Sequence, residues 1–167
     1  MKSHEIFQQM SPALAVEIFT YLQREQTPVY KTVVQGLAQQ RHLRPVFVER
    51  KPPPERYAWL QAALGRKLSD TFAAHLLQSW LLGARKPLLC HFLDSLGIVH
   101  DEDGTVEELP ESPSKEKLHE VITGLLAKYP AETVAVYLHA FHDMDSTVSW
   151  PPLGELLAAD DRLKLGA

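Results

Sequence analysis

The sequence predicts an all-α protein built from antiparallel helical hairpins. Apolar residues recur at helical spacing along most of the chain, and serines and prolines stand where such helices would begin. No stretch alternates apolar and polar residues with β-branched enrichment. Apolar residues form 45% of the 167 residues, enough for a sizeable core. We expect one domain over residues 1–167, with a leader at 1–10 that frays or docks and a loose tail at 161–167.

The stretch from Ser69 to Gly97 shows the helical pattern most clearly. Ser69 is a good N-cap, and the apolar side chains after it share one helix face. These side chains are Phe72, Leu76, Leu77 and Trp80. Gly83 interrupts the run, Pro87 suits the first turn of a second helix, and Gly97 suits the left-handed residue that ends it. Because the connection is short, we expect the two helices to be antiparallel neighbours.

Related patterns lie on both sides of this central hairpin. The pattern that begins at Ser69 begins again at Ser11, and a weaker third copy covers residues 137–157. Three hairpins at near-constant spacing are typical of a degenerate three-fold helical repeat. Unrelated amphipathic helices would also align once gaps are allowed, so both interpretations stay open.

The other predicted elements follow from local start and stop signals. The remaining helices are expected at about Pro12–Arg24, Thr27–Gln40, Glu55–Leu64, 114–128, 130–141 and 151–157, with a short helical piece between Pro45 and the three prolines at 52–54. Residues 98–107 combine an apolar pair, an acidic turn with Gly104 and a second short apolar run. This segment predicts one small β-hairpin or an extended turn.

Charge is distributed unevenly along the chain. Residues 41–67 hold seven Lys and Arg against two Glu, a net charge of +5, and residues 94–120 hold nine acids against two Lys, a net charge of −7. Such regions could face each other within one molecule or across a dimer, or they could be two solvated faces.

The basic region is also a candidate binding surface. Its candidate residues are Arg41, Arg44, Arg50, Lys51 and Arg56. Three aromatic residues (Phe47, Tyr57, Trp59) lie among them, as they would on a nucleic-acid surface. Two glutamates interrupt the region, and the whole chain carries a net charge of −4. Nucleic acid is therefore not expected to be the main partner.

A second candidate site is the cluster of histidines and acids at residues 139–145. His139 and His142 are three residues apart, so they lie near each other on one helix face, and Asp143 and Asp145 could add oxygen ligands. Imidazole with carboxylate suits Mn, Fe or Zn. These side chains could equally be partly exposed residues at the end of a helix, where the dipole favours a cationic histidine.

The His142-Asp143 pair resembles the dyad of the all-helical His-Asp metal phosphohydrolases. The resemblance implies a divalent metal that activates water for attack on phosphate, with His119 as an earlier ligand and Asp160 as a later one. It covers two adjacent residues, and only 24 residues follow Asp143. That is fewer than this family usually places before its last Asp.

The first functional interpretation is a protein-interaction or assembly module without catalytic activity and without a cofactor. Stacked hairpins present a groove or a broad face to another protein or to a second copy. The alternatives are the metal-dependent phosphohydrolase and nucleic-acid binding through residues 41–67. The single cysteine, Cys90, fits a reducing compartment, and no apolar run is long enough for a membrane helix. We therefore expect a cytoplasmic protein with no membrane partner.

Overall fold

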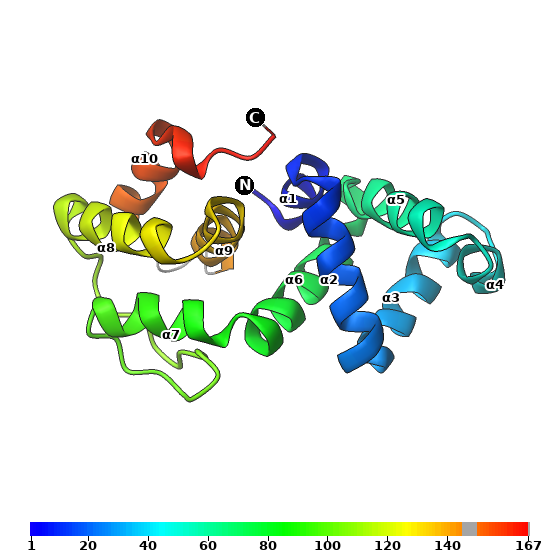
Figure 1. Cartoon of the computed structure of the whole chain (residues 1–167), viewed down its shortest axis with the longest axis horizontal. Coiled ribbons are helices and arrows are strands. Elements are labelled where there is room, and N and C mark those ends of the chain that lie inside the picture. The colour runs from blue at the N-terminus through cyan, green and yellow to red at the C-terminus, as the bar shows by residue number, and fades with distance from the viewer. Residues whose placement is uncertain (145–149, 167) are drawn as a thin grey trace. The chain divides into compact units, whose positions relative to one another are not determined.

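The fold is all-α, as the sequence predicts. The computed structural model describes residues 1–144 and 150–166, and within these ranges it contains ten α-helices, two short 3₁₀ helices and no strand (Figure 1). The α-helices are α1 Ser3–Gln9, α2 Pro12–Glu25, α3 Thr27–Gln40, α4 Pro45–Glu49, α5 Pro53–Leu64, α6 Asp70–Ala84, α7 Lys86–Ser95, α8 Lys115–Lys128, α9 Ala131–Met144 and α10 Pro151–Ala159. The 3₁₀ helices are η1 Lys67–Ser69 and η2 Asp161–Leu163.

The helices form two compact units, unit 1 (Met1–Trp80) and unit 2 (Leu81–Ala167). The boundary falls inside α6, so the predicted central hairpin of α6 and α7 belongs to both units. Three predictions depend on how the two units are related. They are the antiparallel packing of α6 and α7, the three-fold repeat and the single domain. They stay predictions.

Several helix termini follow the local signals. The Ser11 hydroxyl accepts a hydrogen bond from the Leu14 N–H at 3.2 Å, and Ser114 accepts one from Lys117 at the same distance. Ser69, which was expected to be the N-cap of the central helix, is the last residue of η1 and directly precedes α6, and its buried hydroxyl donates to Oε1 of Gln40 at 3.0 Å. The Ser69 side chain thus links η1 to the end of α3.

The N-terminal leader docks rather than frays. It forms α1, and the side chains of Ile6 and Phe7 are fully buried. His4 adds a polar contact, because its backbone N–H and its Nδ1 lie 3.0 and 2.8 Å from Oδ1 of Asp70. Burying two large apolar side chains contributes several kcal/mol, so α1 is part of the unit 1 core.

Aromatic side chains mark the core of each unit. In unit 1 the ring of Phe19 stacks between Phe7 and Tyr57, with centroids 6.0 and 5.8 Å apart. In unit 2 the rings of Phe92, Phe141 and Trp150 follow one another at 5.3 and 5.2 Å. The tail expected to be loose also contributes here, because Leu163 of η2 is fully buried.

The segment at 98–107 is a turn and contains no strand. The Asp101 N–H donates to the Thr105 carbonyl at 2.9 Å, and the Gly104 N–H donates back to the Asp101 carbonyl at 3.0 Å. Gly104 has a φ of +87°, and a Cβ at this position would lie 2.7 Å from Cβ of Leu89 in α7. The turn therefore lies against α7 at a point where only glycine fits.

Two helical glycines provide a matched test of the packing. A methyl group on Gly36 of α3 would overlap the tip of the Phe72 ring, whereas a methyl group on Gly124 of α8 meets nothing within 4 Å. Gly124→Ala should raise the free energy of unfolding by about 0.5–1 kcal/mol through helix propensity alone. Gly36→Ala should lower it by about 1–2 kcal/mol, because overpacking exceeds the same propensity gain. Chemical denaturation followed by circular dichroism measures both changes.

A double mutant shows whether the Phe72 ring is the cause. With Phe72→Leu already in place, the shorter side chain leaves room for a methyl group, so Gly36→Ala should no longer destabilise. An equal loss in both backgrounds would contradict the packing explanation.

Candidate interaction surface

Three large apolar side chains are exposed within five residues at α4. Leu43 is 39% exposed, Val46 37% and Phe47 58%. Four cations surround them in sequence, and none of these is paired with a carboxylate in the part of the chain that the structure describes. We call this set the α4 surface; it consists of Arg41, Leu43, Arg44, Val46, Phe47, Arg50 and Lys51.

The shortness of α4 explains why these apolar side chains stay outside. A helix of five residues makes little more than one turn, so it can direct only one side inward. Val48 takes that inward position and is fully buried. Pro45 fixes the first turn, and Nη1 of Arg56 donates to the Glu49 carbonyl at the other end at 3.2 Å. The helix is thus held at both ends with Phe47 outside.

The chain enters α4 through a strained residue. His42 has a φ of +56°, and it is the one non-glycine residue with positive φ in the described ranges. Its N–H donates to the Gln39 carbonyl, and the Leu43 N–H donates to the Ala38 carbonyl, both within 3.0 Å. This is the Schellman pattern that normally places glycine at such a position. Leu43 is thereby fixed just beyond the end of α3.

Arg56 differs from the other predicted basic residues. Its side chain is only partly exposed, and its guanidinium bonds to the Glu49 carbonyl and lies 5.2 Å from the centroid of the Tyr57 ring. It therefore takes part in the packing of α4 against α5. The other four predicted cations lie within residues 41–51, the same segment that holds the exposed apolar side chains, and each of them is fully or partly exposed. Sequence reasoning grouped Phe47 with Tyr57 and Trp59 and did not predict that it is the most exposed of the three, although the prolines on both sides already limited this helix to about one turn.

An apolar groove lies elsewhere in unit 1, between α1, α2 and α5. It has a volume of about 440 Å³, and the small side chains of Ala58 and Ala62 keep it open beside Val16. Arg66 is the one charged residue in its lining. A single apolar side chain would fit this space, but the lining does not indicate the chemistry of a partner.

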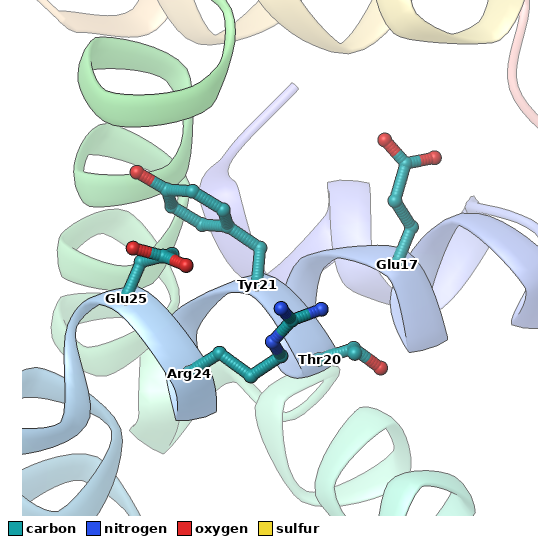
Figure 2. A pocket seen from close by; sticks show the side chains of 5 residues that line it. All are labelled: Glu17, Thr20, Tyr21, Arg24 and Glu25. Carbon is teal, nitrogen blue, oxygen red and sulfur yellow. The ribbon is translucent and has the colours of Figure 1, made fainter.

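A shallower depression of about 360 Å³ lies along α2. Its lining residues all come from this one helix: Glu17, Thr20, Tyr21, Arg24 and Glu25. In Figure 2 the side chains of Glu17 and Tyr21 rise from the same side of α2. Two carboxylates and a guanidinium share this small area, so its charge does not select one class of ligand.

The predicted metal ligands lie in unit 2 around α8, α9 and α10. His119 is exposed on α8 and lies close enough to Asp160 to help lower the pKa of its carboxyl group. His142 lies beside α10, where a Cβ on Gly154 would be 3.1 Å from its Nε2. Asp143 is half-buried near the end of α9 and forms an interaction of its own. Asp145 lies outside the described residues.

Asp160 already has a partner within the chain. Both of its oxygens accept hydrogen bonds from the Arg162 guanidinium, the shortest at 2.7 Å, and these bonds lower the pKa of the carboxyl group. In residues 1–144 and 150–166 no three His, Cys, Asp or Glu side chains are placed to hold a metal ion. The metal site and its hydrolase chemistry stay predictions.

A second charged surface is ordered around the turn that follows α7. Nε2 of His100 lies 2.7 Å from Oδ1 of Asp94, and its Nδ1 lies 2.6 Å from the Asp101 carbonyl. Both contacts raise the pKa of His100. Val99 beside it is 89% exposed. We call residues 94–111 the acidic loop; its exposed acids are Asp94, Asp101, Glu102, Glu107, Glu108 and Glu111.

Comparison with protein-family models, with curated proteins and with solved structures finds no match. None of the described helices combines the length and apolar character needed to cross a bilayer.

Replacing His42 with glycine should stabilise the chain. Glycine adopts positive φ without the steric cost that His42 carries, a gain of about 0.5–1 kcal/mol in the free energy of unfolding. Gly97 holds the equivalent position after α7 with a φ of +70°, and a Cβ there meets nothing within 4 Å. Gly97→Ala should therefore lose about 1 kcal/mol. Urea denaturation measures both, and a destabilised His42→Gly variant would contradict the strain argument.

The buried His139 should make stability depend on pH. It is 7% exposed, its Nε2 lies 3.0 Å from the Leu163 carbonyl, and burial lowers its pKa below the ordinary 6.5. The unfolded chain therefore binds this proton more readily than the folded chain. This contribution to stability is complete above about pH 6.5 and falls as the pH drops below that value. Thermal unfolding measured between about pH 7.5 and 5 tests this.

The matched control is His139→Gln. Its amide can still donate to the Leu163 carbonyl, but it does not titrate. This variant should show a weaker loss of melting temperature on acidification than the wild type. Identical pH dependence in the two proteins would exclude His139 as the cause.

Proposed function

We propose that this protein is a non-catalytic protein-interaction module and that the α4 surface is its contact surface. The observation that carries this proposal is Phe47, which is 58% exposed and follows two other exposed apolar side chains in a segment that also carries four cations. Clusters of this kind on soluble proteins commonly mark binding surfaces.

The composition of the α4 surface supports a protein partner. Protein interfaces are enriched in aromatic residues and arginine, and an anchor aromatic near the centre commonly supplies much of the binding energy. Phe47 has that position, with Arg44 and Arg50 three residues before and after it. Arginine also stacks on aromatic rings and forms bidentate hydrogen bonds with carboxylates. Because α4 is held at both ends, little ordering cost would accompany binding.

Nucleic-acid binding is less well supported. Of the three aromatic residues in the basic region, Tyr57 stacks on Phe19 and bonds to Gln23 through its hydroxyl at 2.9 Å, and Trp59 is half-buried. Only Phe47 offers an open ring to a base. Stacking platforms for single strands usually combine several such rings with a basic groove.

A photo-reactive phenylalanine analogue at position 47 tests the proposal in cells that express the full chain. We expect a discrete crosslinked protein adduct that Arg44→Glu or Arg50→Glu weakens several-fold, because both cations border the probe. The control carries the same probe at Lys31, an exposed position on α3. Adducts of equal yield at both positions, or none at position 47, would contradict the proposal. Adducts to nucleic acid instead of protein would favour the rival function.

A further inference from the structure

We propose that the partner of the α4 surface is the acidic loop of a second copy of this chain. This inference rests on the proposed function and names the occupant of the same surface. It makes the protein a self-assembling module whose contacts join a basic surface on one copy to an acidic surface on another.

The acidic loop is held in a defined conformation by contacts with the rest of unit 2. The contacts of His100 described above close it onto the end of α7, and Gly104 lies against Leu89. At its far end, Nε1 of Trp150 donates to the Pro110 carbonyl at 3.3 Å. The acids therefore project from an ordered backbone, which limits the entropy lost when they bind.

The two surfaces complement each other in both charge and apolar character. The basic region from 41 to 67 has a net charge of +5, and the region from 94 to 120 has a net charge of −7. Each surface also exposes apolar side chains among its charges, Phe47 at 58% on one and Val99 at 89% on the other. Like charges within each surface disfavour pairing with itself, so pairing between the two is the favourable combination.

A second copy is the acidic partner that is present wherever the protein is present, and always in equal amount. Two copies that exchange both contacts form a closed dimer, and copies that exchange one contact each form a longer assembly. A closed dimer makes the contact twice, so even weak surface ion pairs add up to measurable association.

Analytical ultracentrifugation of the full chain tests the inference. At low ionic strength we expect concentration-dependent association below about 200 μM, weakened at least about tenfold in about 0.5 M salt as screening shortens the reach of the charges. Phe47→Ser and Val99→Ser should each weaken association by about tenfold. A chain that stays monomeric at low salt, or association insensitive to salt and to both substitutions, would overturn the inference.

Charge reversal identifies the two surfaces. One variant carries Arg44→Glu with Arg50→Glu, and the other carries Glu102→Lys with Glu107→Lys; all four side chains are exposed. Each variant alone should associate much more weakly than the wild type, because the substitutions reduce the net charge of residues 41–67 from +5 to +1 or that of residues 94–120 from −7 to −3. A mixture of the two should associate again, since the unaltered basic surface of one variant meets the unaltered acidic loop of the other. No association in the mixture would contradict the pairing.

One control variant and a comparison with the crosslinking experiment separate the possible failures. Arg24→Glu with Lys31→Glu changes the net charge equally but leaves the α4 surface intact, so self-association should persist. Loss of association in this control would contradict the assigned surfaces. If the chain is monomeric while the probe at position 47 still crosslinks another protein, the second-copy inference fails and the interaction function stands. If both are absent, both fail.

Discussion

A short helix can bury only a limited surface, and this limit determines which side chains are buried throughout the described chain. Every helix here is 15 residues or shorter, and each directs one face into a core. Long side chains meet in those cores, as the stacked rings of Phe7 and Phe19 do in unit 1. In α4 the constraint is most severe, because five residues bury one side chain, Val48, and leave Phe47 in solvent. The candidate surface is a direct result of that geometry.

Local chemistry made part of this structure predictable. Ser11, Ser114 and Gly97 act where their side chains, or the lack of one, suit a helix end, and such effects depend only on near neighbours. Ser69 looked equivalent, but in the fold its hydroxyl bonds to Gln40, twenty-nine residues away. The docking of α1 could not be predicted from local signals either, because the burial of Phe7 depends on helices that come later in the chain.

The candidate site was predictable to a smaller extent. The sequence located the cations, and the structure separates Arg56, which supports α4, from Arg44 and its neighbours, which border exposed apolar groups. Whether an apolar residue such as Phe47 faces a core or solvent depends on tertiary packing that periodicity cannot resolve over a single turn. The positive φ of His42 was not predictable either, because composition and periodicity carry no signal for backbone strain at a single residue.

The position of the single cysteine makes the acidic loop observable without any added label. Sγ of Cys90 lies 3.5 Å from the Glu102 carbonyl, and burial raises the pKa of this half-covered thiol. The thiolate is the reactive form, so a thiol reagent should modify Cys90 slowly while the loop lies on α7 and faster when the loop lifts. Modification kinetics of the unaltered protein therefore measure how often this loop opens.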